Sequence, residues 1–536
     1  MTDRSGELTA AGTPYVPRAA LAVLLVLAGM AVTVTYVETM VLPAFKQFIT
    51  FFGGAAPTTV AWILSAYLLV GTVATPIFGK LGDKYGKKRV LLFVMGVYAV
   101  AVALAGFTPN LGAYFGVSRP GQIYLLIAVR AVQGVGMAMF PLAFAMIPEV
   151  FPAARVGPAQ GAVSAMFATG AAIGLSVGGW VAQDFGWQFT YHTVVPVAIA
   201  LFVFAAWLLH ESPHRHPHPI DLPGIASLGV ALTMFLLGIT EGTAWGWTNL
   251  AAVRLGGGLA WGVPEFFLLA AVGLAFFLYW EPRATFPVVS FRALKERNIL
   301  ISNVTGMVTG LAMFLIFVTD AYLAELAVPP GFALSESHFG LIALPAALGM
   351  LVVGPFFGLA SSRYGPKPTM LVGFALVAGG AVGLTLYHHT VLEITLWPIP
   401  ILVGLVGTMI AMTNVIVLTA DRRELGIQTG MNQTFRNLGS AIGPVLATSV
   451  IASFTTRYVL PLPAPSIPVP TDTGFALVFG MVALLAVVGL ALSLGLRNFR
   501  FASDGTRREP SAASASPAAE ATVPEEARIG AASRSR

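Results

Sequence analysis

The chain of 536 residues is long enough for roughly three or four soluble domains of about 100–200 residues each. Its composition excludes that architecture, because 56% of the residues are hydrophobic, only 10% are charged and the mean hydropathy is +0.80, whereas soluble domains average about 25% charged residues. The formal charge of +6 comes from 30 Lys and Arg against 24 Asp and Glu, and the absence of cysteine excludes disulfides and thiolate metal sites. We predict an all-α integral membrane protein.

Apolar runs between polar breaks predict fourteen transmembrane helices, because about 20 mostly apolar residues are enough for a helix to cross a bilayer. In chain order these runs are about 19–42, 58–79, 89–107, 122–148, 158–182, 191–209, 224–240, 264–280, 298–323, 338–361, 368–387, 396–419, 427–454 and 475–496. The first run lacks a small-residue cleavage site, so we expect a retained helix rather than a removed signal peptide.

The distribution of Lys and Arg predicts which loops face the cytoplasm, since cytoplasmic loops carry an excess of cations. With both termini placed inside, the short inner loops hold fifteen Lys and Arg and the outer loops hold four. We therefore expect cytoplasmic tails at 1–18 and 498–536. The second tail is rich in Ala, Ser, Pro, Glu and Arg, a composition typical of disorder.

The sequence contains an internal repeat. Gly79–Lys88 is echoed by Gly358–Lys367, and glycines share one spacing in two places: Gly157, Gly161, Gly170 and Gly174, then Gly426, Gly430, Gly439 and Gly443. Both pairs are separated by eight predicted helices. This spacing predicts two six-helix bundles, 19–209 and 298–497, separated by a two-helix insertion with its flanking loops at 210–297. Parallel repeats of this kind are typical of transporters, whose binding site lies near the midplane between the halves.

Three segments resemble motifs of the major facilitator superfamily. Gly79–Arg89 is similar to its G-x-L-a-D-r-x-G-r-k loop, and Arg130–Gly136 resembles the R-x-x-q-G-x-g motif of proton-driven members. Gly170–Gly179 resembles the exporter element G-x-x-x-G-P-x-x-G-G, with Leu175 in place of the proline. Over about 19–497 the chain is similar to the fourteen-helix drug:proton antiporter branch. The resemblance implies the major facilitator fold, two six-helix bundles plus two inserted helices, and export of amphiphilic organic compounds in exchange for protons by alternating access.

A proton site is expected in the first helix. By resemblance, an Asp nine residues before the proline that ends this helix would be the carboxylate, but that position counted from Pro43 is Val34. Glu38 lies four residues on, one turn along the same helical face. We interpret Glu38 as the proton-accepting carboxylate, and the resemblance implies that Arg130 modulates it. A salt bridge between them is geometrically possible, while the alternative is that Glu38 reaches the membrane interface.

Other polar side chains in predicted helices are candidates for a substrate cavity. An intramembrane charge costs about 2.5–3.5 kcal/mol, so it usually faces a cavity or a partner. We expect a cavity lined by Asp320, Asn432, Gln433 and Arg436. The alternatives are that Asp320 reaches the interface and that the polar patch ties helices together through hydrogen bonds.

Two glycine-containing segments are expected to serve conformational change. The resemblance implies a conformational latch in the first, formed by Gly79, Asp83, Gly86, Lys87 and Lys88; its alternative is a loop that only sets topology. Small residues let helices approach closely, so a helix-packing hinge is expected at Gly170, Gly174, Gly178 and Gly179. Static packing is the alternative there.

Enzymatic function is disfavoured. The chain has no phosphate-binding loop ending in Lys-Ser/Thr, no H-E-x-x-H and no G-x-S-x-G. We expect no cofactor and no metal site, because the histidine-rich loop with His210, His214, His216 and His218 is interrupted by prolines and offers no fixed geometry.

We therefore predict a proton-coupled efflux transporter for amphiphilic organic compounds or drugs. We expect a monomer that crosses the plasma membrane many times, with protons, a small organic substrate and lipid as partners and no nucleic acid. The alternative is a permease or exporter for a narrow class of metabolites. The identity and charge of the substrate stay open.

Overall fold

A computed structural model gives the fold and describes residues 18–151, 153–211, 221–248, 253–254, 260–285, 287–419, 425–458, 467–497, 500–501 and 507–508. Nearly all of the two predicted tails lies outside these residues. So do His214, His216 and His218 of the histidine-rich loop.

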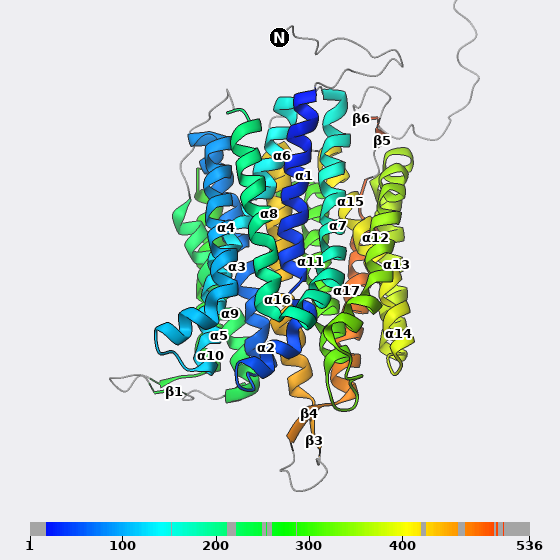
Figure 1. Ribbon diagram of the computed structural model, residues 1–536. Helices are drawn as coiled ribbons and strands as arrows, with labels where there is room; N and C mark the ends of the chain where they lie inside the picture. The colour runs from blue at the N-terminus through cyan, green and yellow to red at the C-terminus, as the bar shows by residue number, and fades with distance from the viewer. Residues whose placement is uncertain are drawn as a thin grey trace, which may run out of the picture.

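Long helices run side by side and form almost the whole body of the protein (Figure 1). Group 1 comprises α1 (Arg18–Thr39), η1 (Leu42–Ala44), α2 (Phe45–Phe51), α3 (Pro57–Tyr85), α4 (Lys87–Tyr114), α5 (Arg119–Gln133), η2 (Gly134–Ala138), α6 (Met139–Val150), α7 (Ala153–Phe185) and α8 (Trp187–Leu208). Two helices follow, α9 (Leu222–Trp245) and α10 (Val263–Trp280), with the short turns η3 (Glu281–Arg283) and η4 (Ala293–Lys295). Group 2 comprises α11 (Arg297–Glu325), α12 (Glu336–Tyr364), α13 (Pro366–Leu386), α14 (Val391–Leu396), α15 (Pro398–Thr419), α16 (Leu425–Ser453) and α17 (Asp472–Leu494).

The strands of the described residues form three short antiparallel pairs in connections and after the last helix. The pairs are β1 (Val253–Arg254) with β2 (Ala260–Trp261), β3 (Thr455–Tyr458) with β4 (Ile467–Pro470), and β5 (Arg500–Phe501) with β6 (Arg507–Arg508). In the longest pair Thr455 lies opposite Pro470 and Tyr458 opposite Ile467. These pairs extend the ends of helices and do not contribute a sheet to the core.

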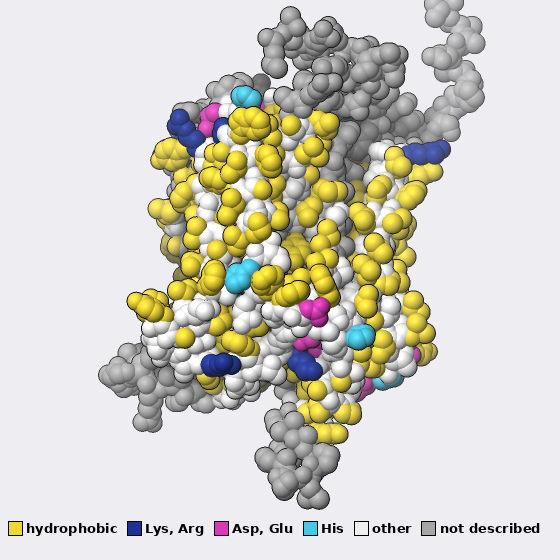
Figure 2. Space-filling view, in the orientation of Figure 1, with side chains coloured by type: hydrophobic (Ala, Val, Ile, Leu, Met, Phe, Trp, Pro, Cys, Tyr) yellow, Lys and Arg dark blue, Asp and Glu magenta, His cyan; other side chains and the backbone are white. Residues whose placement is uncertain are grey.

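The helical body has the surface of a membrane protein. Twelve helical segments of the described residues are long and apolar enough to cross a bilayer. Large apolar side chains such as Leu25, Trp207 and Leu359 are exposed on the outside of the bundle. Figure 2 shows hydrophobic side chains over most of the height of the visible face, with charged side chains toward its two ends. A continuous apolar surface of this kind requires lipid around it, so the chain is a multi-pass membrane protein.

The first predicted helix, 19–42, corresponds to α1, which spans Arg18–Thr39. The apolar segment continues over Ala20–Phe51, as α1, η1 and α2. Pro43 lies at the start of η1, where a proline is tolerated, although it would break a helix in its interior. The chain then forms α2 because Phe48 and Phe52 pack against the buried ring of Trp187.

The two repeated loops lie at the same end of the bundle. Figure 1 shows α2 and α14 at the end opposite the N-terminus. Since α3 follows α2 and α13 precedes α14, the end of α3 and the start of α13 both lie at the N-terminal end. We call this end the near face, and the end with α2, α14, β3 and β4 the far face.

The repeated loops also share their local structure. Gly86 after α3 has φ 108° and Gly365 after α12 has φ 94°, a backbone conformation that favours glycine because it has no Cβ. The preceding tyrosine carries a cation over its ring in each loop, Lys84 over Tyr85 at 5.0 Å and Arg363 over Tyr364 at 5.4 Å.

The glycine spacing repeats as a helix contact. Gly170 and Gly174 of α7 lie against the backbone of α1, and Gly439 and Gly443 of α16 lie against α11 in the same way. Each of these helix pairs joins the first helix of its group to the helix that carries the repeated glycines. The structure therefore repeats the pattern of the sequence.

The two groups pack together through α3 on α16 and α7 on α12. On the far face polar contacts join them directly. Gln183 Oε1 of α7 accepts hydrogen bonds from the backbone N and Oγ of Ser337, at 3.1 and 2.5 Å. Glu325 Oε2 at the end of α11 accepts one from Lys46 N of α2 at 2.8 Å. The structure is thus closed between the groups at the far face.

Candidate functional site

Glu38 is a buried carboxylate at the boundary between the two groups. It lies in the last turn of α1 and its side chain is only 7% exposed. Among the described residues no hydrogen bond or ion pair reaches its carboxylate, but the charges of Arg436 and Arg130 attract it. Because Arg436 belongs to group 2 and Arg130 to group 1, Glu38 interacts electrostatically with both groups. Its burial argues against the alternative that it reaches the interface.

The turn that carries Glu38 is fixed by close packing on α7. Gly170 lies against Val32 and Thr35, and Gly174 against Tyr36 and Thr39, at distances that leave no room for a Cβ. Thr39 Oγ1 also donates a hydrogen bond to Ala171 O of α7 at 3.2 Å. The position of Glu38 is therefore coupled to that of α7.

Arg130 is fully buried within group 1, at the end of α5. Its Nε donates to Ile63 O at 3.0 Å and one terminal nitrogen donates to Gln133 Oε1 at 2.9 Å. The guanidinium lies over the ring of Tyr67, 4.5 Å from its centroid, and 5.9 Å from that of Tyr191. The second terminal nitrogen has no hydrogen-bond partner among the described residues. Arg130 and Glu38 form no salt bridge in this conformation, so a vacant donor remains on the arginine.

Arg436 on α16 was expected in a substrate cavity, and its charge is near enough to that of Glu38 for the two to attract each other. One terminal nitrogen approaches Met409 Sδ of α15 at 3.7 Å. Sequence reasoning missed the attraction to Glu38, since these helices are far apart in the chain and belong to different groups. The only available signal was that both are charged residues within apolar helices.

The remaining residues of the expected cavity divide between two surroundings. Asn432 Nδ2 donates to Ser302 O of α11 at 2.9 Å, and Gln433 Nε2 donates to Asn437 Oδ1 at 2.8 Å. The first contact joins α16 to α11, as in the alternative in which the polar patch ties helices together, whereas the second lies within α16. Asp320 on α11 differs, because its Oδ1 is buried without a hydrogen-bond partner among the described residues.

Glu325 is a buried carboxylate that sequence reasoning missed. It is the last residue of α11, where the predicted helix had already ended at 323. Its Oε2 binds Lys46 N across the far face, while its Oε1 has no hydrogen-bond partner among the described residues. The contact joins α11 to α2, which the sequence had assigned to a loop.

Two of the expected latch residues, Lys87 and Lys88, form polar contacts at the near face. Lys87 Nζ pairs with Glu149 Oε1 of α6 at 2.5 Å, and Lys88 Nζ donates to Ala206 O of α8 at 2.7 Å. After α8, Glu211 Oε1 accepts from Lys88 N at 3.1 Å. The loop that joins α3 to α4 is thus held by the ends of α6 and α8.

Glu149 and Glu211 were missed as partners of this loop, because acidic residues near predicted helix ends look like ordinary solvated side chains. Both line a cavity of about 140 Å³ at the near face, together with His210 of the histidine-rich loop. His210 is the member of that loop that the described residues include.

The expected hinge glycines of α7 lie between the two groups. Gly178 lies against Met40 of group 1, and Gly179 lies against Glu336 O of α12 in group 2. In return, Gly340 of α12 lies against Ser176 O of α7. Without side chains at these positions the backbones approach closely, so α7 contacts α1 on one side and α12 on the other.

Comparison with known proteins identifies relatives over most of the chain. The Multidrug transporter protein MdtP of Bacillus subtilis (strain 168) is 25% identical over 417 residues, 77% of this chain and 72% of the relative. The Tetracenomycin C resistance and export protein of Streptomyces glaucescens is 28% identical over 449 residues, 82% of this chain and 77% of the relative. The crystal structure of the human organic anion transporter MFSD10 (TETRAN) matches 89% of this chain and 100% of that chain with a TM-score of 0.56 at 15% identity, a likeness of fold alone.

A sequence profile described as Major Facilitator Superfamily matches residues 27–444 and, a second time, residues 305–533. The first match covers well over half of the chain and includes Glu38, Arg130 and the loop that joins α3 to α4. The resemblance drawn from the three motifs is confirmed. This protein belongs to the Major Facilitator Superfamily, and is a secondary transporter rather than an enzyme.

Proposed function

We propose that this transporter exports amphiphilic organic compounds across the plasma membrane in exchange for protons. The observation that carries the proposal is the position of Glu38, a buried carboxylate with no hydrogen-bond partner among the described residues, attracted by an arginine from each helical group. The multidrug and tetracenomycin transporters named above support the direction and the class of substrate.

The charge of Glu38 can bias the packing of the two groups. At an effective dielectric constant of about 20, two opposite charges about 4 Å apart attract each other by about 4 kcal/mol, and the attraction falls as their distance grows. An ionised Glu38 favours conformations that bring Arg436 close, and a proton on Glu38 removes that attraction. Since about 1.4 kcal/mol changes an equilibrium tenfold, an attraction of about 3 kcal/mol lets one proton change the balance between two conformations about 100-fold.

The arrangement in the membrane follows from the same groups of helices. Twelve helical segments of the described residues are long and apolar enough to cross a bilayer. We propose that α7, with 33 residues, and α16, with 29 residues, cross it as well. At 1.5 Å per residue both exceed the bilayer core of about 30 Å. The chain then has fourteen spans, with bundles at 19–209 and 298–497 around the insertion at 210–297. The cations Lys84, Lys87 and Lys88 support a cytoplasmic near face and cytoplasmic termini.

Glu38→Gln tests the proton site, because glutamine keeps the size of the side chain but cannot exchange a proton. Purified protein in proteoliposomes with an imposed proton gradient would be tested with cationic and anionic amphiphilic dyes. We expect Glu38→Gln to abolish gradient-driven accumulation while dye exchange without a gradient continues. Glu241→Gln is the matched control, since Glu241 is a partly buried carboxylate on α9 outside both groups, and it should transport like the wild type.

Three outcomes would contradict the proposal in different ways. Gradient-driven accumulation by Glu38→Gln with unchanged pH dependence would remove Glu38 from the mechanism; loss of accumulation in Asp320→Asn alone would move the proton site to α11. Failure of the wild-type protein to accumulate any dye under either direction of the gradient would leave the alternative, a permease or exporter for a narrow class of metabolites.

A further inference from the structure

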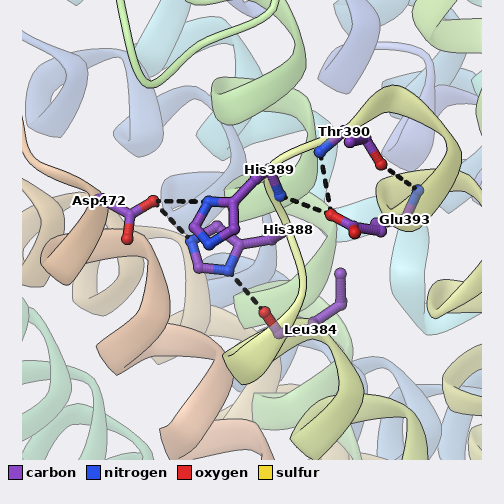
Figure 3. A network of polar contacts seen from close by, with 6 residues as sticks. All are labelled: Leu384, His388, His389, Thr390, Glu393 and Asp472. Atoms are coloured by element: carbon purple, nitrogen blue, oxygen red, sulfur yellow. Dashed lines mark hydrogen bonds and ion pairs between the residues drawn. The ribbon is translucent and has the colours of Figure 1, made fainter.

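A cluster of two histidines and one carboxylate lies in group 2, where the connection from α13 to α14 meets the start of α17 (Figure 3). His388 and His389 connect α13 to α14, and Asp472 is the first residue of α17. The two imidazoles and the carboxylate each offer a ligand atom, and these three atoms lie within 4.8 Å of one another. We propose that the cluster binds one divalent transition-metal ion of the zinc class.

The hydrogen bond of His388 fixes which ring nitrogen faces the cluster. His388 Nδ1 lies 2.7 Å from Leu384 O. A carbonyl oxygen can only accept, so Nδ1 carries the hydrogen and the neutral ring has its lone pair on Nε2. Histidines that bind metals commonly donate their other ring N–H to a backbone carbonyl in this way, which fixes the tautomer and the ring orientation.

The lone pair on Nε2 points at another electron-rich atom. His388 Nε2 lies 3.0 Å from Asp472 Oδ1, yet it has no hydrogen-bond partner among the described residues, and the His388 side chain is only 2% exposed. His389 Nδ1 lies 3.4 Å from the same oxygen. Two lone pairs at such distances repel each other unless a proton or a metal ion lies between them. The structure therefore calls for positive charge at this point.

The spacing fits a tetrahedral metal site. Zinc binds histidine nitrogen and carboxylate oxygen at about 2.0–2.2 Å, so neighbouring ligands of a tetrahedron are about 3.3–3.5 Å apart. The two measured distances from Asp472 Oδ1, 3.0 and 3.4 Å, lie close to this range. Two nitrogens and one oxygen suit zinc, whereas magnesium prefers oxygen ligands only.

The backbone around the ligands is held in place. Glu393 Oε2 accepts hydrogen bonds from His389 N at 2.8 Å and Thr390 N at 3.0 Å, and Thr390 Oγ1 accepts one from Glu393 N at 3.3 Å. The ring of His388 also packs edge-on against Phe479 of α17, with centroids 5.4 Å apart. The connection between α13 and α14 is thus ordered against α17 before any ion binds.

One side of the cluster is open to solvent. The side chain of His389 is 61% exposed and that of Asp472 is 49% exposed. An ion can therefore enter from the far face, and the fourth ligand position is left for water. A bound ion would join the α13–α14 connection to the start of α17, and so stabilise the far-face end of group 2.

Zinc binding to the full-length protein tests the proposal. The protein would be purified through an affinity tag without histidine, and titrated with Zn²⁺ in detergent about one pH unit above the usual imidazole pKa of about 6.5. We expect one Zn²⁺ per chain, a thermal midpoint that rises with Zn²⁺, and no response to Mg²⁺. Asp472→Asn and His389→Gln should each weaken binding at least about 100-fold, since loss of even an outer hydrogen-bond partner of a ligand costs about 10–100-fold.

Controls separate this site from other sources of binding. His338→Gln changes another exposed histidine of the far face, one that pairs with Ser335, and should bind Zn²⁺ like the wild type. Because His388 is buried, its variant could fail to fold, and the two exposed ligands keep the test decisive. Absence of Zn²⁺ binding to the wild type, or binding by both ligand variants as tight as that of the wild type, would overturn the proposal. The proposal would also be overturned if Asp472→Asn lowered the thermal midpoint while Zn²⁺ changed the midpoint of neither the wild type nor the variant. The cluster would then be an ion pair between the carboxylate and a protonated histidine.

Discussion

Glu325→Ala should open the far face. Glu325 Oε2 accepts the backbone N–H of Lys46, and this hydrogen bond joins α11 of group 2 to α2 of group 1. Deleting the carboxylate leaves the partly buried N–H without its partner. A transporter that alternates between two conformations must break such a contact when the far face opens, so the loss falls on the closed conformation alone.

The size of the effect follows from the chemistry of the contact. Leaving one buried donor or acceptor unsatisfied costs about 1–3 kcal/mol. With RT of about 0.6 kcal/mol, this corresponds to a change of about 5- to 150-fold in the ratio of open to closed molecules. Glu325→Gln keeps an acceptor oxygen and should change the ratio less than alanine does.

Spin labels on the far face can measure this ratio. The chain has no cysteine, so cysteines placed at Thr50 and Leu341, two exposed positions on α2 and α12, would be the only labelled sites. We expect Glu325→Ala to increase the population with long distances in double electron–electron resonance. Glu265→Ala is the matched control, because Glu265 also accepts one backbone N–H at 2.8 Å, from Gly262, but within the start of α10.

An unchanged distance distribution in Glu325→Ala would refute the reasoning. It would mean that the hydrogen bond persists when the far face opens, or that the packing around it decides the closure without it. A similar shift in Glu265→Ala would point to a general loosening of helix ends instead.

Two further substitutions test the near-face loop and the buried arginine. Gly86→Ala should destabilise the protein by about 1–3 kcal/mol, because alanine is strained at φ 108° and its Cβ would meet the carboxylate of Glu211. Its control is Gly79→Ala, whose Cβ would meet open space and which should leave the thermal midpoint nearly unchanged. Equal thermal midpoints for the two variants would contradict this prediction. Arg130→Lys should impair transport while the protein still folds, because lysine cannot bind Ile63 O and Gln133 together while lying flat on Tyr67. Arg119→Lys, which also removes an arginine from an aromatic ring, is its control in the same transport assay, and wild-type transport by Arg130→Lys would argue against a fixed role for the guanidinium.

The helices were predictable because the signals that define them are local. A run of about 20 apolar residues can be recognised without knowledge of packing. So can the two repeats, the loop that recurs after 279 positions and the glycine spacing that recurs after 269 positions. Helix ends were less predictable. The α2 segment looked like a loop after Pro43, and it became a helix only because Phe48 and Phe52 bury themselves against Trp187, more than 130 residues later.

The site residues show the same division. Glu38 could be named from its charge and its place one turn from Val34 on the same helical face, but its attraction to Arg436 could not, because nothing local relates α1 to α16. Glu211 depends on the reversal at Gly86, which brings the N–H of Lys88 to its carboxylate. The adjacent histidines 388 and 389 carried no metal signal on their own, since the third ligand, Asp472, begins a helix that returns to them only in the folded protein.

The packing of α7 gives a physical route from Glu38 to the interface between the groups. One residue beyond Glu38, Thr39 lies against Gly174, and Met40 lies against Gly178. The next residue of α7, Gly179, lies against the backbone of α12 at Glu336. Gly174, Gly178 and Gly179 have no side chain that could adjust to a small movement. A shift of the last turn of α1 must therefore displace α7 or change its contact with α12. The glycines that make this contact close are therefore suited to transmit a change in the charge of Glu38 to the packing of the two groups, provided that the turn moves when Glu38 gains a proton.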